Sequence, residues 1–337
     1  MVTVLTTVVT TVVAAFLVLS LAGLGKAAPL TKVKFSETVR SVFYYPIYIA
    51  FSQGFFEKEG LEVDFSTAWG GDKCAAALFS GQVDINFMGP EAAVYIYNQG
   101  APDYLVLFAE LTAKDGQFLV SKKREPNFKW TDVKGKTIIG MRPGSMPELC
   151  DEAAVRNAGL DLKKDVKILT NITYTALAGA FASGMADYAA LFEPQASLAE
   201  KEGFGYVVAS IGEAVGPTAY TGFHVRKEYI KAHPDIIQRF TNAIYRGMLW
   251  SQHHTPAEIV KAIEKFFPEA DKDILQQAVM RYVKINGIQK TPVVTKESFE
   301  RLQDLVALGG ELAKRVPFEK MVNNEFAERA VATIKEP

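Results

Sequence analysis

The chain has 337 residues, 49% of them hydrophobic, and is therefore long enough for two domains that each bury a core. Its formal net charge is −1, with acidic and basic residues mixed along the sequence. This near-neutral charge gives no reason to expect nucleic acid or an anionic membrane surface as a partner.

Residues 1–28 form an apolar run that ends in small residues, which predicts a signal peptide cleaved near Ala28 or Pro29. No Lys or Arg precedes the run, and it holds enough apolar residues to span a bilayer. A retained membrane anchor therefore stays an alternative to cleavage. In both cases the sequence predicts export to a periplasmic or extracytoplasmic location.

In chain order, the next part of the sequence predicts a strand, a long helix, a strand, a short helix and a strand, at residues 32–39, 41–60, 61–68, 73–81 and 83–89. A polar stretch with Pro126 and Gly135, residues 122–136, suits a crossover between domains. Alternating strands and helices then follow at 137–141, 146–160, 166–170, 174–184 and 186–192. Residues 218–226 predict one more strand, and helical periodicity runs from Lys227 to about Ile334.

One segment of the chain occurs twice. Residues 63–84 match residues 166–187 without a gap, and Gly81, Asp84, Gly184 and Asp187 are among the identical positions. Two copies are too few for a solenoid. The repeat predicts two similar α/β domains that face each other across a cleft, with 29–120 and 217–337 in the first lobe and 121–216 in the second.

Ligands of open parallel sheets lie beyond the carboxyl ends of the strands, where loops lead into helices. This rule predicts a binding site formed by six loops, Tyr44–Tyr48, Trp69–Asp72, Met88–Glu91, Arg142–Met146, Asn171–Thr175 and Phe192–Gln195.

Three segments carry a resemblance to a known family: YYPIYIAFSQGFFEKEGLEVDF, LFSGQVDINFMGPEAAVY and KGKTIIGMRPGS. They resemble the periplasmic solute-binding proteins of the nitrate, sulfonate, taurine and thiamine-pyrimidine-precursor class, and the similarity covers residues 32–250. The resemblance implies an α/β fold of the two-lobed, type II clam-shell kind, each lobe a mostly parallel sheet flanked by helices. It also implies ligand capture by domain closure, delivery to an inner-membrane ABC permease, and no catalysis.

The predicted ligand-binding residues are of four kinds. Glycines let the backbone approach a ligand, aromatic rings stack on a flat solute, and polar or charged groups bind its edges. The fourth kind comprises the thiols and a methionine near the loops. The full set is Tyr44, Tyr45, Trp69, Gly70, Gly71, Cys74, Met88, Gly89, Glu91, Arg142, Gly144, Ser145, Cys150, Tyr174, Glu193 and Tyr220. Phe192 ranks below the other aromatic residues because it ends an apolar strand.

The charges in these loops favour one ligand class. Asp72, Glu91, Glu148 and Glu193 outnumber Lys73 and Arg142, whereas a cleft for a small bare anion is expected to carry several basic side chains. The excess favours a solute rich in N–H donors, with Glu193 as the expected carboxylate. Arg142 is expected to hold a carboxylate or phosphate tail.

The only cysteines, Cys74 and Cys150, leave three interpretations open: a disulfide that tethers the lobes, a dithiol for a soft metal or thiophilic ligand, and two buried structural thiols.

Signals for an enzyme are weak. The four histidines form no metal pair at a known spacing with the cysteines, and no P-loop, G-x-S-x-G or dinucleotide fingerprint occurs. The sequence thus predicts no cofactor and no metal.

The function predicted from the sequence is extracytoplasmic capture of a small planar, nitrogen-rich solute, pyrimidine-like or flavin-like, by a monomeric component of an ABC importer. A small anion such as a sulfonate, bicarbonate or nitrate is the alternative ligand. A pyridoxal-phosphate-dependent, pyrimidine-forming enzyme on the same fold is the alternative of another class.

Overall fold

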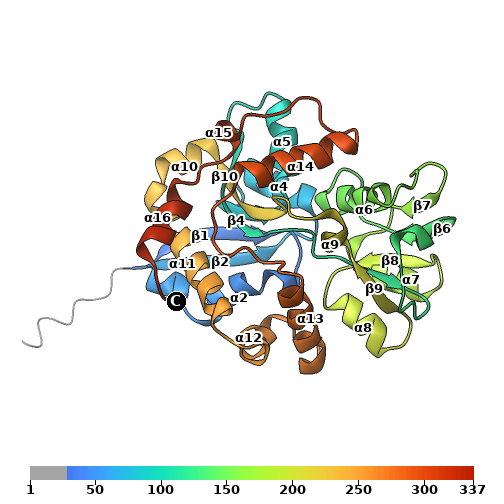
Figure 1. Cartoon of the computed structure of the whole chain (residues 1–337). Coiled ribbons are helices and arrows are strands. Elements are labelled where there is room, and N and C mark those ends of the chain that lie inside the picture. The colour runs from blue at the N-terminus through green and yellow to red at the C-terminus, as the bar shows by residue number, and fades with distance from the viewer. Residues whose placement is uncertain (1–28) are drawn as a thin grey trace, which may run out of the picture.

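The computed structural model describes residues 29–337 and contains two five-stranded sheets in two lobes (Figure 1). The predicted signal peptide lies outside the described residues. The first sheet has the order β2-β1-β3-β10-β4, with β1 Thr31–Glu37, β2 Leu61–Thr67, β3 Ile85–Met88, β4 Leu105–Thr112 and β10 Thr221–Arg226. The second has the order β7-β6-β8-β5-β9, with β5 Phe118–Ser121, β6 Lys136–Ile139, β7 Val166–Leu169, β8 Tyr188–Leu191 and β9 Tyr206–Ser210.

The sequence repeat is a repeat of structure. β2, β1 and β3 are parallel in the first sheet as β7, β6 and β8 are in the second. The repeated aspartates have the same role, because Asp84 Oδ2 accepts a hydrogen bond from Lys34 N at 2.8 Å and Asp187 Oδ2 accepts one from Thr137 N at 3.0 Å. Each carboxylate thus connects the end of the repeated unit to the backbone of the neighbouring strand, β1 or β6.

The lobes are joined by two crossings of the chain, between β4 and β5 and between β9 and β10. In each sheet the one antiparallel strand, β10 or β5, lies beside such a crossing. The predicted crossover at 122–136 is wrong, because β5 already belongs to the second sheet and this segment lies within the second lobe. The predicted boundary after residue 120 likewise falls inside β5.

Helices cover the faces of both sheets. Those of the first lobe are α2 Tyr45–Ser52, α3 Phe55–Lys58, α4 Gly71–Phe79 and α5 Glu91–Asn98, and those of the second are α6 Met146–Asn157, α7 Leu177–Ala182, α8 Gln195–Lys201 and α9 Ile211–Val215. The single helix predicted at 41–60 is divided, because Gly54 adopts a left-handed φ of 66° between α2 and α3.

The C-terminal helices surround the first lobe in Figure 1 and also reach the second. They are α10 Lys227–Ala232, α11 Pro234–Gln252, α12 Pro256–Ile263, α13 Lys272–Lys284, α14 Lys296–Leu308, α15 Phe318–Met321 and α16 Glu325–Thr333. α11 packs on α2, whereas α13 contacts α8 and α14 contacts α6. The C-terminal part therefore helps to set how the lobes sit against each other.

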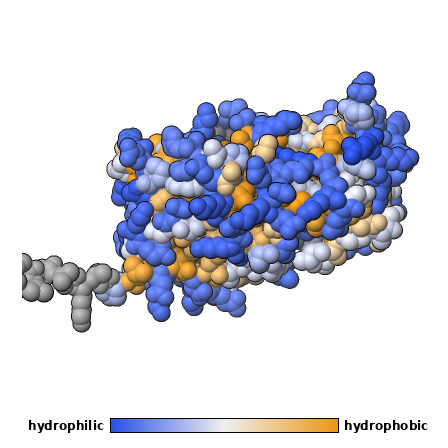
Figure 2. Space-filling model, turned by 90° about the horizontal axis from the view of Figure 1, so that it is seen from below, coloured by the Kyte–Doolittle hydropathy of each residue, from blue (hydrophilic) through white to orange (hydrophobic). Residues whose placement is uncertain are grey.

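Most buried side chains form one hydrophobic core that extends through both lobes, with Phe35, Phe223 and Phe240 in mutual contact beside the first sheet. A smaller core in the second lobe includes Val133 and Tyr188. The face shown in Figure 2 is mostly hydrophilic, with small separate hydrophobic areas. Among residues 29–337, no helix combines the length and apolar character of a bilayer span.

Candidate functional site

A cavity of about 390 Å³ lies between the lobes at the ends of the parallel strands. All six predicted loops contribute residues to its wall, three from each lobe. The volume is within the range of small-molecule sites. The sequence rule that ligand loops follow strand ends therefore located the cavity.

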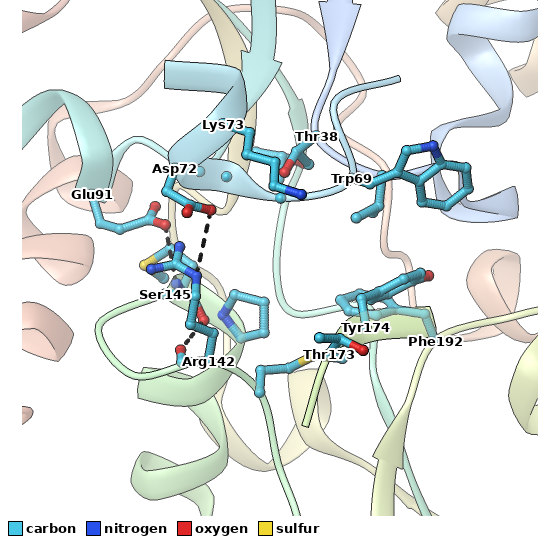
Figure 3. Close-up of a pocket in the computed structure, with 18 of the residues that line it drawn as sticks. Thr38, Trp69, Asp72, Lys73, Glu91, Arg142, Ser145, Thr173, Tyr174 and Phe192 are labelled. Carbon is cyan, nitrogen blue, oxygen red and sulfur yellow. Dashed lines mark hydrogen bonds and ion pairs between the residues drawn. The ribbon is translucent and has the colours of Figure 1, made fainter. Parts of the chain in front are cut away.

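Aromatic side chains form one end of this cavity (Figure 3). The ring centroids of Trp69, from the first lobe, and Tyr174, from the second, are 6.5 Å apart. Phe192 lies next to Tyr174, with 6.2 Å between the ring centroids. Trp69 is 48% exposed and has a left-handed φ of 57°, which is rare for a bulky residue. An exposed tryptophan held in such a conformation, facing a tyrosine of the other lobe, offers a surface on which a flat group can stack.

Charged and polar side chains form the other end (Figure 3). Arg142 Nε, in the second lobe, lies 3.7 Å from Asp72 Oδ1 of the first lobe, and both side chains are at least half exposed. Ser145 Oγ donates a 2.6 Å hydrogen bond to the Arg142 carbonyl, which fixes the loop before α6. Lys73, in the first turn of α4, also lines the cavity.

Glu91 is the buried carboxylate of the cavity wall. Its Oε1 accepts a 3.2 Å hydrogen bond from the Met146 backbone N–H, which belongs to the opposite lobe. Oε2 is buried and has no hydrogen-bond partner among residues 29–337. Burial raises the pKa of Glu91 to about 7, although the backbone N–H groups of Met146, Glu91 and Ala92 and the charge of Arg142 oppose the shift.

A second hydrogen bond between the lobes lies beside Glu91. Tyr95 Oη, on the same helix, donates to the Gly144 carbonyl at 2.9 Å. The Gly144 N–H donates in turn to Glu148 Oε2 at 3.2 Å. The loop before α6 is thereby held against α5.

Ten of the sixteen predicted site residues line the cavity: Tyr44, Trp69, Gly70, Gly71, Gly89, Glu91, Arg142, Ser145, Tyr174 and Tyr220. Their contact with a ligand stays a prediction. The other six do not line it: Tyr45, Cys74, Met88, Gly144, Cys150 and Glu193. Tyr45 and Met88 face the hydrophobic core, and Gly144 is occupied by the hydrogen bonds to Tyr95 and Glu148.

Glu193 was the carboxylate expected to bind the solute, and the structure corrects its position. Its side chain is fully buried away from the cavity, with Oε1 2.6 Å from Arg281 Nη1 and Oε2 accepting a 2.9 Å hydrogen bond from Ser197 N. Its neighbour Phe192 lines the cavity instead. The strand thus presents its aromatic residue to the site and turns its acid toward α13.

The two cysteines are free and fully buried. Cys74 Sγ donates to the Ser36 carbonyl at 3.6 Å, and burial raises its pKa to about 12. Burial also raises the pKa of Cys150. The disulfide interpretation is wrong for this structure, and both thiols belong to the core. Among the described residues, no cluster of three or more His, Cys, Asp or Glu side chains could hold a metal ion.

The predicted acidic excess is also wrong. Glu148 and Glu193 do not line the cavity, so Asp72 and Glu91 face Lys73 and Arg142 in equal number. Because the pKa of Glu91 is near 7, this carboxyl is partly protonated at neutral pH. Charge count therefore does not separate an N–H-rich solute from an anion.

Thirteen lining residues were not among the sixteen predicted ligand-binding residues: Thr38, Val39, Asp72, Lys73, Met141, Met146, Pro147, Thr170, Asn171, Ile172, Thr173, Phe192 and Thr221. Six of them lie within the predicted loops: Asp72, Met146, Asn171, Ile172, Thr173 and Phe192. Three of them, Thr38, Thr170 and Phe192, directly follow β1, β7 and β8. Val39, Met141 and residues 171–173 lie within four residues of a strand end. The strand-end rule would have found these loop positions if every residue in a loop had been considered, whatever its side-chain chemistry. It would not have found Lys73 and Pro147, which lie in helices, or Thr221, which begins β10.

Comparisons with known proteins agree with this architecture. A family model described as "NMT1/THI5 like" matches residues 43–258. YtlA of Bacillus subtilis (strain 168), named as a putative binding protein, is 41% identical over 317 residues, which cover 94% of this chain and 95% of YtlA.

Two solved structures show the same fold at low identity. The alkanesulfonate-binding protein SsuA from Xanthomonas axonopodis pv. citri, bound to MOPS, has a TM-score of 0.71 and 17% identity, covering 88% of this chain and 100% of SsuA. The periplasmic nitrate-binding protein NrtA from Synechocystis PCC 6803 has a TM-score of 0.74 and 15% identity, covering 93% of this chain and 91% of NrtA.

Proposed function

This chain belongs to the NMT1/THI5-like family, and from that premise we propose that it is the solute-binding component of an ABC importer. It is exported through residues 1–28 and works as a monomer outside the cytoplasmic membrane. A permease in that membrane receives the solute. The two-lobed α/β fold, which it shares with periplasmic binding proteins, supports this role.

The proposed solute is a small planar, nitrogen-rich ring such as a pyrimidine or a flavin-like heterocycle. The observation that carries this proposal is the facing pair of Trp69 and Tyr174, one from each lobe, at the aromatic end of the cavity. A ring between them would contact both lobes only when the lobes are closed. Binding would therefore shift the population toward the closed form that a permease recognises.

An anion is the second candidate, supported by the polar end. Arg142 and Lys73 lie there together with Gly70 and Gly71 at the start of α4, where backbone N–H groups and the helix dipole favour negative charge. SsuA and NrtA, whose names specify an alkanesulfonate and nitrate, have the same fold. A sulfonate, bicarbonate or nitrate would occupy this end.

A non-catalytic role is part of the proposal. His224, the histidine nearest to the cavity along the chain, is buried in β10 and does not line the cavity, and burial lowers its pKa to about 3. The pyridoxal-phosphate alternative is tested by the absorbance spectrum of the purified chain, in which a bound cofactor band would contradict a pure binding function.

The test is calorimetric titration of the mature chain, residues 29–337, with aminopyrimidines, flavins, alkyl sulfonates, bicarbonate and nitrate. Trp69→Ala should weaken binding of a planar ring about tenfold or more, since stacking on one aromatic side chain contributes about 1–3 kcal/mol. Phe79→Ala is the matched control, because Phe79 is 46% exposed on the far end of α4 and does not line the cavity.

The same titration separates the two candidates. An anionic ligand should be insensitive to Trp69→Ala and should be lost with Arg142→Gln, whereas a neutral ring should show the opposite pattern. Native mass spectrometry of the chain purified without denaturation adds a direct readout, because a co-purified solute would appear as a mass that denaturation removes. No binding to any member of the panel would contradict the planar-solute proposal.

A further inference from the structure

The two oxygens of Glu91 have different surroundings. Oε1 is bound to the Met146 N–H of the opposite lobe, whereas Oε2 is buried and unpartnered in the cavity wall. Glu91 is only 6% exposed, so water does not replace the missing partner freely. A buried acceptor without a donor is unfavourable, and native proteins usually satisfy such atoms.

The neighbouring cation does not supply that partner. Arg142 forms its ion pair with Asp72, and its guanidinium is half exposed. Gly89 lies against Oε2, because a Cβ built on this glycine would lie 2.1 Å from the oxygen. A side chain at position 89 would displace the carboxylate, so glycine there keeps Oε2 in its place in the wall.

We propose that Glu91 is a specificity-determining residue that accepts a hydrogen bond from an N–H donor of the solute through Oε2 while Oε1 holds the opposite lobe. This inference rests on the proposed binding function and names the chemistry that one wall of the site selects. The selected group is an amino, amidine or protonated ring N–H. A ring of the same shape without that donor leaves Oε2 unpaired and binds more weakly.

The arrangement links recognition to closure through a single carboxylate. Glu91 begins α5 in the first lobe and Met146 begins α6 in the second, so the Oε1 bond exists only when the two helix starts are close together. A donor on the solute that fixes the carboxylate would also orient Oε1 toward Met146. Solutes with the donor should therefore close the lobes more completely.

The first experiment compares 4-aminopyrimidine with 4-methylpyrimidine, which replaces the donor by a methyl group of similar size. In Glu91→Gln the amide oxygen can still accept from Met146, but the amide nitrogen is a donor where Oε2 was an acceptor. We expect a loss of about tenfold or more for the amino compound and a change within about twofold for the methyl compound. Glu110→Gln is the matched control, because Glu110 is likewise a buried glutamate whose pKa burial raises, and it does not line the cavity.

The second experiment removes the hydrogen bond between the Met146 N–H and Glu91 Oε1 without changing the carboxylate. Met146→Pro deletes the N–H, and proline suits this position because Met146 is the first residue of α6 and Ser145 before it is extended, with ψ of 150°. Met146→Ala removes the same side chain but keeps the N–H. The proline variant should bind 4-aminopyrimidine more weakly than the alanine variant, whereas the preference for the amino over the methyl compound should be the same in both.

The outcomes separate this inference from the proposed function. If the wild-type chain binds both pyrimidines and Glu91→Gln weakens both equally, the inference is wrong and the planar-solute proposal survives. Binding of neither compound by the wild-type chain would overturn both. A Glu91→Gln variant that does not fold, judged by circular dichroism, would also overturn the inference. The inference gives Glu91 a role in binding the solute and the Met146 N–H, and no role in stabilising the core.

Discussion

Arg281 and Glu193 provide the sharpest test of how the second lobe is held. Glu193 is fully buried, and apart from Arg281 its carboxylate has the Ser197 N–H as partner. Glu200, the other carboxylate on Arg281, is 25% exposed and keeps a 2.8 Å hydrogen bond from Gln277. Replacement of the guanidinium in Arg281→Met therefore leaves one uncompensated buried charge, that of Glu193.

Breaking a buried ion pair from one side costs about 3–5 kcal/mol. The Arg281 side chain is 18% exposed, so the lower end of this energy range applies. We expect Arg281→Met to lower the free energy of unfolding by about 3 kcal/mol. The double variant Arg281→Met with Glu193→Gln should recover most of this loss, since the neutral amide oxygen still accepts from Ser197. Urea unfolding, followed by far-ultraviolet circular dichroism, measures the free energy of unfolding of the single and of the double variant. A single-variant loss below about 1 kcal/mol, or a double variant no better than the single one, would refute the reasoning.

Three further predictions concern buried groups. Burial raises the pKa of Glu110 from 4.5 to about 8, so between these pH values the folded chain keeps a proton that the unfolded chain has released. The free energy of unfolding should therefore fall as the pH rises from 4.5 to about 8. Urea titrations of Glu110→Gln should show no such dependence. Tyr220→Phe deletes a buried hydroxyl that has no partner among residues 29–337, so the unfolding midpoint should not fall, and reduced solute affinity would assign the hydroxyl to the ligand. Cys74 and Cys150 should resist a thiol reagent in the native chain and give two thiols after denaturation; fewer than two would indicate a disulfide.

The sequence repeat predicted a part of the fold correctly. A match between two segments 103 residues apart predicted two similar units, and Asp84 and Asp187 indeed make equivalent hydrogen bonds in the two lobes. The pattern is informative because both copies keep the same residues at the same spacing, although each aspartate hydrogen-bonds a backbone N–H fifty residues earlier in the chain. The predicted loops located the cavity because they follow strand ends.

Features that depend on distant parts of the chain were not predictable. The strands β4, β5 and β9 were not identified, and β5 pairs with β8 and β9, which lie more than sixty residues later. Glu193 follows a strand just as a ligand-binding acid would, but its partner Arg281 lies 88 residues away on α13. No local pattern indicates which of two adjacent residues, Phe192 or Glu193, faces the cavity.

The corrected charge balance changes how a ligand is inferred from the cavity. With Asp72 and Glu91 against Lys73 and Arg142, net charge selects no class of solute, whereas the aromatic and charged ends of the cavity suit different parts of a ligand. A bare inorganic anion would use the charged end and leave Trp69 and Tyr174 in contact only with each other and with Phe192. A planar ring with a polar substituent would occupy both ends at once and bring both lobes into contact. The responses to Trp69→Ala and Arg142→Gln therefore distinguish three cases: a bare anion depends on Arg142, a neutral ring depends on Trp69, and a solute that occupies both ends depends on both.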